Sequence, residues 1–271
     1  MDRNPEGGSG RSLALPIQGL SFIALAVVTS FFGYLWGSTS PNPAELLAPT
    51  LFWYAVAVLL LAYPLREAFD GFLRYVRTRA GGTAFVVYLL VHVLLYGFML
   101  ESILVSFFDR PFVAASANVF VTTSVFAPPS LSNAIIGLWF NPWITLTIPP
   151  VLSDAISFYS LTIAVIIAIL IVANIGKTRE LGAVCSAAAR SRSLVILPAI
   201  GIVLGASCCL SVPVLVTVAT PSAAVLSSSL WVYDATYFFF PVFAVLVLYL
   251  NLRSVAKLTE SAGLSGPSRR T

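Results

Sequence analysis

The stretch Gly205-Ala-Ser-Cys-Cys-Leu-Ser-Val-Pro213 lies inside one uncharged run, Leu194 to Ala219. A run of this length and apolarity is typical of a helix that crosses a membrane. Two adjacent cysteines, Cys208 and Cys209, therefore lie within a predicted membrane helix. Pro213 has no backbone N–H, so the carbonyl of Cys209 loses its helical partner and we expect the helix to kink there.

One face of this predicted helix carries small residues. Gly201, Gly205, Cys209 and Pro213 recur every four positions, and residues so spaced lie on the same side of a helix. Because paired glycines let a second helix approach closely, we predict that Gly201, Gly205 and Pro213 form a helix-packing face. Thiolates favour soft ions such as Cu(I) and Zn(II), which makes Cys208 and Cys209 candidate metal ligands. The alternative is that both cysteines are buried as small hydrophobic residues.

A family resemblance rests on the same residues. The segment from Leu204 to Val216, followed by an apolar helix from Trp231 to Leu250, resembles the first helical hairpin of the mercuric-ion transport proteins. That family carries a vicinal cysteine pair in a membrane helix, with a proline and an aliphatic run after it. The resemblance covers residues 194–250 only. It implies that Cys208 and Cys209 receive a soft metal ion (Hg, Cu or Zn) as a substrate from the outer side.

The composition of the whole chain indicates an integral membrane protein. Of its residues, 58% are hydrophobic and only 10% are charged, and the mean hydropathy is +0.94; such values are typical of membrane proteins. The single histidine excludes haem and metal sites that need several histidines. We find no P-loop, no dinucleotide-binding glycine pattern and no Gly-x-Ser-x-Gly motif. We therefore predict that the chain is not an enzyme.

The apolar runs predict an all-α bundle with six membrane spans. Residues 65–80 place apolar and charged side chains on opposite helical faces, which predicts an amphipathic helix on the inner surface, stopped by Gly81-Gly82. Two polar ends are expected to be disordered cytoplasmic tails, residues 1–11 and 253–271. The predicted spans are approximately 13–36, 49–64, 83–108, 156–175, 194–219 and 230–252.

Two interpretations are open for residues 109–155. This segment holds two apolar stretches, Phe112–Ala127 and Ala134–Ile148, separated by Pro128-Pro129. They could be two further spans, for a total of eight. We favour an outer segment with interfacial or re-entrant helices, because Asn141-Pro142-Trp143 interrupts the second stretch and non-helical backbone at membrane depth has to be buried in protein.

The basic residues fix the predicted orientation. With six spans, every basic residue except Arg110 falls on one side of the membrane. Because Lys and Arg are enriched in cytoplasmic loops, the protein is predicted to lie in the cell membrane with both termini in the cytoplasm. The net charge of +4 is then a topology signal, and no nucleic-acid partner is expected.

Ionisable residues within the predicted spans are candidates for a metal relay, since buried charges are costly and often functional. At about 1.5 Å per residue, Glu101 and Asp234 lie on the outer side of the cysteine pair, His92 lies slightly inward of it and Cys185 lies at the cytoplasmic side. This order predicts a path from carboxylates to thiols to imidazole to thiol. For His92 the alternative is a neutral ring bonded to a tyrosine or a carbonyl.

A second function fits the same sequence. The glycine-bearing helix face and the scarcity of charge within the spans are also expected of a non-catalytic structural or assembly subunit of a membrane complex. The expected partners are the lipid bilayer and, for this second function, other membrane subunits or further copies of the chain.

Overall fold

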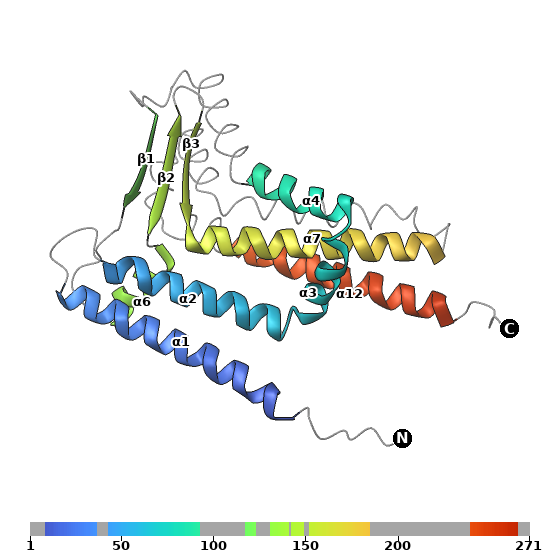
Figure 1. Cartoon of the computed structure of the whole chain (residues 1–271), viewed down its shortest axis with the longest axis horizontal. Coiled ribbons are helices and arrows are strands. Elements are labelled where there is room, and N and C mark those ends of the chain that lie inside the picture. The colour runs from blue at the N-terminus through green and yellow to red at the C-terminus, as the bar shows by residue number, and fades with distance from the viewer. Residues whose placement is uncertain are drawn as a thin grey trace, which may run out of the picture. The chain divides into compact units, whose positions relative to one another are not determined.

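A computed structural model of the chain describes residues 9–36, 43–92, 117–122, 131–140, 142–148, 152–184 and 239–264 (Figure 1). The described residues are mostly helical, as predicted from the apolar runs. They fall into two compact units. The first comprises Met1–Pro64, Val119–Thr145 and Ile156–Thr162, and the second comprises Leu65–Asn118, Leu146–Ala155 and Ile163–Thr271.

The first unit is built on a helical hairpin. Helix α1 (Ser9–Trp36) packs against α2 (Pro43–Ala62), and their close contact depends on Gly19, where an added Cβ would lie 2.6 Å from a methyl carbon of Leu59. The short helix α6 (Leu131–Phe140) closes one end of this hairpin. Both long helices bond to it, since Ser30 Oγ donates to the carbonyl of Ala134 at 3.0 Å and Trp53 Nε1 donates to the carbonyl of Leu138 at 2.8 Å.

Three strands were not predicted. β1 (Asn118–Thr122), β2 (Trp143–Ile148) and β3 (Leu152–Ser157) form one sheet in that order. Only residues 149–151 separate β2 from β3, so this pair runs antiparallel (Figure 1). The expectation of an all-helical outer segment is therefore wrong at these strands, although α6 does form within the second apolar stretch. The reason is that β1 and β2 are rich in the β-branched residues Val, Ile and Thr, which favour extended backbone.

The second unit is organised around α7 (Phe158–Val184), which belongs to it from Ile163 onward. Most of α7 is buried. Three further helices belong to the unit: α3 (Arg66–Tyr75), α4 (Arg79–Leu90) and α12 (Phe240–Leu264). Helix α12 buries one face that includes Ala244, Leu248 and Val255, whereas Phe243, Leu246 and Leu250 on another face are exposed.

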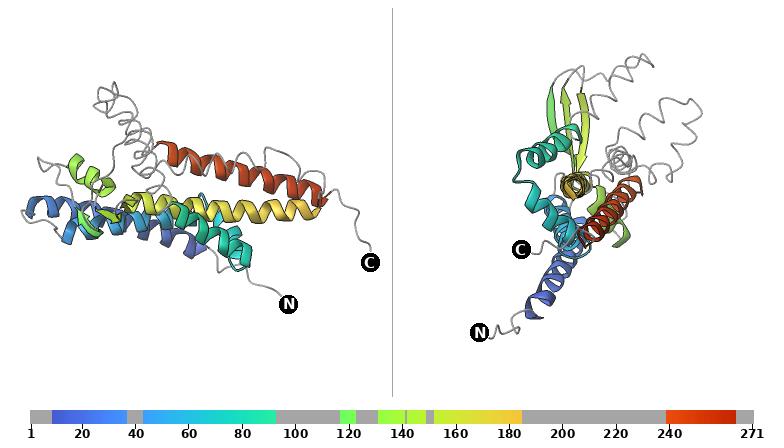
Figure 2. Two further views of the ribbon diagram at one scale, coloured as in Figure 1. Left: turned by 90° about the horizontal axis from the view of Figure 1, so that it is seen from above. Right: turned by 90° about the vertical axis from the view of Figure 1, so that its right-hand side faces the viewer.

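Helices α7 and α12 run in the same direction. Asn174 of α7 contacts Leu248 and Asn251 of α12, and Leu181, two turns further along α7, packs with Val255, one turn beyond Asn251 on α12. Figure 1 and the left view of Figure 2 show the two helices side by side with the same polarity. Parallel packing of two helices so close together constrains the path of the chain between them.

The amphipathic helix predicted at residues 65–80 is present but shorter, and the reason given for its end was wrong. Helix α3 ends at Tyr75, and the chain turns through residues 76–78 before α4 begins. Thr78 caps α4 by accepting a hydrogen bond from the Gly81 N–H at 3.1 Å. Gly81-Gly82 therefore lies in the first turn of α4 and does not stop the preceding helix. The third predicted span accordingly begins at Arg79 and not at residue 83.

By length and composition, two helices among the described residues could cross a membrane, Phe158–Leu181 and Phe240–Ser261. The number rises to three if Leu46–Ala62 and Arg66–Tyr75 form one broken span. Pro16–Phe32 and Arg79–Leu90 are shorter apolar helices. The two helices Phe158–Leu181 and Phe240–Ser261 overlap the fourth and the last predicted spans, so the described residues do not support six membrane spans. Residues 194–219 lie outside the described part.

Both predicted tails are partly helical. Helix α1 begins at Ser9, and α12 continues past residue 252 to Leu264. The prediction of a disordered tail from residue 253 is wrong for its first half. Polar residues follow Arg253, but Val255 is fully buried and Ala256 nearly so. Helix α12 therefore keeps one apolar face buried for about one more turn, in which Val255 packs with Leu181 of α7.

Candidate functional site

Most of the residues predicted to carry function lie outside the described part of the chain. These residues are Cys208, Cys209, Cys185, Glu101, Asp234, Gly201, Gly205 and Pro213. His92 is the one candidate that the structure describes. Among the described residues, no group of three or more His, Cys, Asp or Glu side chains could hold a metal ion.

His92 is engaged by a tyrosine. Its ring is 2% exposed, and its Nδ1 lies 3.2 Å from the hydroxyl of Tyr88, one helical turn earlier. The two rings are tilted, with centroids 5.6 Å apart. Residues four apart on a helix share a face, which is why the spacing of Tyr88 and His92 produces this contact. The structure therefore agrees with the alternative in which His92 bonds to a tyrosine.

The most buried polar contact of the second unit joins α7 to α12. Asn174 and Asn251 are 2% and 4% exposed. Asn174 Nδ2 donates to the carbonyl of Leu170 at 2.8 Å and to the carbonyl of Leu248 at 3.1 Å. Asn251 Nδ2 in turn donates to Asn174 Oδ1 at 2.8 Å. We refer to Asn174 and Asn251 as the amide pair.

The chemistry of the amide pair fixes its orientation. Both N–H groups of Asn174 face carbonyl oxygens, so its Oδ1 has to be the atom that faces Asn251. Turning the Asn251 amide around would bring two oxygens together. The pair therefore specifies one register between two otherwise apolar helices, and interhelical hydrogen bonds of this kind are worth about 0.6–2 kcal/mol in membranes.

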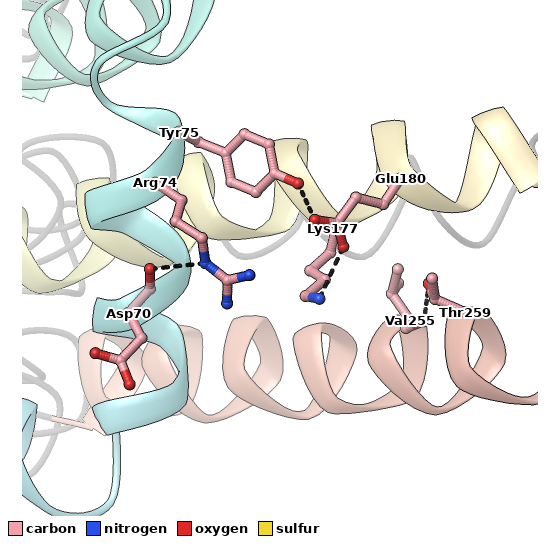
Figure 3. A network of polar contacts seen from close by, with 7 residues as sticks. All are labelled: Asp70, Arg74, Tyr75, Lys177, Glu180, Val255 and Thr259. Carbon is pink, nitrogen blue, oxygen red and sulfur yellow. Dashed lines mark hydrogen bonds and ion pairs between the residues drawn. The ribbon is translucent and has the colours of Figure 1, made fainter. Parts of the chain in front are cut away.

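A second polar group lies further along α7, and we call it the inner-end network: Tyr75, Lys177 and Glu180 (Figure 3). The hydroxyl of Tyr75 on α3 donates to Glu180 Oε1, and Lys177 Nζ lies 2.8 Å from Glu180 Oε2. The side chains of Lys177 and Glu180 are only 21% and 35% exposed, against 77% and 57% for the Arg66–Asp70 pair. Solvent therefore screens the Lys177–Glu180 pair less than the Arg66–Asp70 pair. Each pair lies within one helix, so the bond from Tyr75 to Glu180 is the contact of this network that joins α3 to α7.

Glycines make the close approach of α3 to α7 possible. An added Cβ at Gly176 would lie 1.9 Å from the ring of Tyr75, so the ring rests directly on the α7 backbone. An added Cβ at Gly71 would meet Ala173 at 3.5 Å, which is an ordinary contact. Gly176 is therefore required by the tyrosine ring, whereas Gly71 is not required by its neighbour.

Basic residues of the second unit gather at one end of it. Helix α3 reaches α12 through Glu67 and Arg253, whose charged atoms are 4.0 Å apart, and reaches α7 through the inner-end network. All described basic residues of this unit belong to α3, to the turn after it and the start of α4, or to the last turns of α7 and α12: Arg66, Arg74, Arg77, Arg79, Lys177, Arg179, Arg253 and Lys257. The side predicted to be cytoplasmic is thus one physical end of the unit.

The first unit contains an aromatic cluster. Trp53 lies between Trp139 and Tyr159, with ring centroids 4.9 and 5.1 Å away. Trp139 and Tyr159 also contact each other at 5.6 Å, and Phe52 contacts both tryptophans. Trp53 and Tyr159 are buried. Rings this close fill the space between them, so the cluster is a packed core and not an open cage for a ligand.

Neither the amide pair nor the inner-end network was predicted from the sequence. Asn174 carried a usable signal, because it is a polar amide within the apolar run Ile163 to Ile175, and polar residues in membrane helices usually bond across a helix interface. The pairing of Glu180 with a tyrosine more than a hundred positions earlier had no signal in a single sequence.

Comparisons with protein-family models, curated proteins and solved structures found no match to this chain.

Proposed function

We propose that this chain is a multi-pass membrane protein in which the segment between α7 and α12 crosses back through the membrane and presents Cys208 and Cys209 to a soft metal ion. The observation that supports this is the parallel packing of α7 and α12. The chain leaves α7 at its inner end, at Val184, and has to re-enter α12 at the opposite end, at Phe240.

The return path requires one crossing. Helix α7 has 27 residues, and at 1.5 Å per residue it is about 40 Å long. The apolar run 194–219 is uncharged and long enough to cover a hydrocarbon core of about 30 Å. In the six-span topology this run makes the crossing. Two membrane helices that run in the same direction have to be joined by an odd number of crossings, and this single crossing satisfies that condition.

The gathering of basic residues supports the orientation. Because Lys and Arg are enriched on the cytoplasmic side, the end that holds the inner-end network faces the cytoplasm. In this orientation α7 and α12 both run inward, the cysteine helix runs outward and both termini are cytoplasmic.

The two thiols supply the chemistry. Thiolates bind soft ions such as Hg(II), Cu(I) and Zn(II), and Pro213 frees the carbonyl of Cys209 beside them. The proposed path for the ion leads from Glu101 and Asp234 to the cysteine pair and on to Cys185. The bond between His92 and Tyr88 favours a packing role for the imidazole.

A structural subunit of a membrane complex is the second candidate. This function is favoured by the hydrogen bonds of the amide pair, Ser30 and Trp53. All of them join helices of the chain itself, which is a structural role. For this function the cysteines would serve as packing residues.

The deciding experiment is a metal titration of detergent-purified protein. We expect one Hg(II) or Cu(I) per chain, with a thiolate-to-metal absorption band, and loss of both in the variant Cys208→Ser/Cys209→Ser. Cys185→Ser removes the last ligand of the proposed path and should still bind the ion at Cys208 and Cys209 and retain the band. Equal binding by the wild type and the double variant, or none by either, would reject the metal function, and co-purification of a stoichiometric partner would then favour the subunit.

A further inference from the structure

Three arginines at the corner between α3 and α4 are exposed, and none of them forms an ion pair among the described residues. We refer to Arg74, Arg77 and Arg79 as the arginine corner. Arg74 Nε donates to the backbone carbonyl of Asp70 at 3.4 Å, and the charge of Arg74 also acts on Tyr75 and Glu180. In contrast, Arg66 on α3 forms an ion pair with Asp70, and Arg253 on α12 forms one with Glu67.

The backbone of the corner is held firmly. The carbonyl of Tyr75 accepts hydrogen bonds from the Thr78 N–H at 2.9 Å and the Thr78 hydroxyl at 2.7 Å. Gly81 packs against the same carbonyl so closely that a Cβ would lie 2.1 Å from the oxygen. The ring of Tyr75 rests on Gly176, and its hydroxyl bonds to Glu180. The three arginines therefore start from a fixed backbone at the basic end of the unit.

Exposed apolar side chains lie on both of the helices that meet at the corner. Leu73 on α3 is 42% exposed, and Val86, Val87 and Leu90 on α4 are about half exposed. An exposed apolar surface beside arginines is typical of a helix that lies in the headgroup region, with its apolar side chains in the acyl layer. The guanidinium group binds phosphate through two parallel hydrogen bonds.

From these contacts we infer that the arginine corner binds anionic phospholipid headgroups of the cytoplasmic leaflet. This inference rests on the membrane orientation proposed above and is independent of metal binding. Charge complementarity selects the partner: three exposed guanidinium groups that form no ion pair among the described residues face a leaflet whose surface potential is negative. Arg66 and Arg253 each have an acid within 4.0 Å, Asp70 and Glu67, which reduces the net charge that they present to the leaflet.

The test uses the full chain in nanodiscs of phosphatidylcholine alone or with phosphatidylglycerol at a ratio of 7:3. Native mass spectrometry counts the phosphatidylglycerol molecules that each chain retains. The variant Arg74→Gln/Arg77→Gln/Arg79→Gln should retain roughly tenfold less than the wild type, since each surface arginine adds appreciably to binding. The matched control Arg66→Gln/Lys177→Gln/Arg253→Gln removes the same charge at the same end from side chains that each have an acid partner. It should stay within about twofold of the wild type.

If both triple variants lose phosphatidylglycerol equally, net charge alone explains the effect and the inference is overturned. It is also overturned if both variants retain as much phosphatidylglycerol as the wild type. If the corner variant does not fold, the single variants Arg77→Gln and Arg77→Lys decide the question, because lysine keeps the charge and should restore most of the retention. Competition by inorganic phosphate at millimolar concentration would reject a lipid surface. Failure of the wild type to enter phosphatidylcholine nanodiscs would instead reject the membrane proposal itself.

Discussion

Asn251 donates a hydrogen bond of 2.8 Å to Oδ1 of Asn174, and these two buried amides join two helices that run in the same direction. Few other polar atoms lie along this interface in the described residues, where Ile171, Leu248 and Leu252 are apolar and buried. Apolar side chains alone permit several helix registers, whereas the amides satisfy each other in one.

The amide pair predicts unequal effects of two similar substitutions. Asn174→Leu removes all three hydrogen bonds and should lower the free energy of unfolding by about 1–2 kcal/mol. Asn251→Leu removes one bond and leaves Asn174 Nδ2 on its two carbonyls, so it should cost less. SDS titration of the purified protein measures both values. Because both single variants lose the bond between the two amides, the double variant Asn174→Leu/Asn251→Leu should lose less stability than the sum of the two single losses. A loss equal to that sum would contradict the direct pairing.

The fit of Tyr75 onto Gly176 predicts a position that does not tolerate alanine. In Gly176→Ala the new methyl group would overlap the tyrosine ring and separate its hydroxyl from Glu180, at an expected cost of about 1–3 kcal/mol. Gly71→Ala is the matched control on α3, and because its Cβ has room it should be neutral or more stable by up to about 1 kcal/mol. Thermal melting in detergent compares the two variants. Gly176→Ala should add little to the loss already caused by Tyr75→Ala.

The hydrogen bond from Trp53 to the carbonyl of Leu138 predicts the effect of a conservative change in the first unit. Trp53→Phe keeps an aromatic ring but leaves a buried carbonyl without its donor, which should cost about 1–3 kcal/mol. Tyr54→Phe, on the neighbouring residue that is 63% exposed, should change the melting temperature little. A Trp53→Phe protein as stable as the wild type would show that ring packing alone supports this contact.

The parallel arrangement of α7 and α12 predicts the sidedness of the segment between them. In intact cells, a membrane-impermeant maleimide should label Ser227→Cys in an otherwise cysteine-free chain. It should label native Cys185 in the Cys208→Ser/Cys209→Ser background only after permeabilisation. Labelling of both positions from the same side would contradict a single return crossing.

The apolar runs predicted the long helices well because length and hydropathy are properties of single segments. Their ends were predicted less well, since composition changes at Arg253 while the buried face of α12 continues through Val255. A tail was predicted there because charge was weighed above periodicity. The three-residue and four-residue spacing of Leu252, Val255 and Ala256 was the better guide.

The strands show a different limit. The run Ile144-Thr-Leu-Thr-Ile148 alternates apolar and hydroxylated residues, a pattern of period two that favours a strand. In a chain this hydrophobic, the same residues were interpreted as part of an interfacial helix. The pattern at Gly81-Gly82 was misleading in a similar way, because a glycine required by the close approach of Tyr75 was interpreted as a helix stop.

The candidate site could be predicted only in part. The cysteine pair remains a prediction, because Cys208 and Cys209 lie outside the described residues. The partner of His92 was foreseen from helical spacing, since Tyr88 is one turn away. The partner of Asn174 was not, because contacts between helices far apart in the sequence depend on packing that one sequence does not reveal.

The separation of the amide pair along the chain has a consequence for biosynthesis. Asn251 is made 77 residues after Asn174, and at about 5–20 residues per second this is a delay of roughly 4–15 s. In the membrane topology proposed above, α7 enters the bilayer during that interval before Asn251 is available to pair with its amide. Its bond to the carbonyl of Leu170, one turn earlier on the same helix, needs no other segment and shields one N–H from lipid while the ribosome completes the rest of the protein.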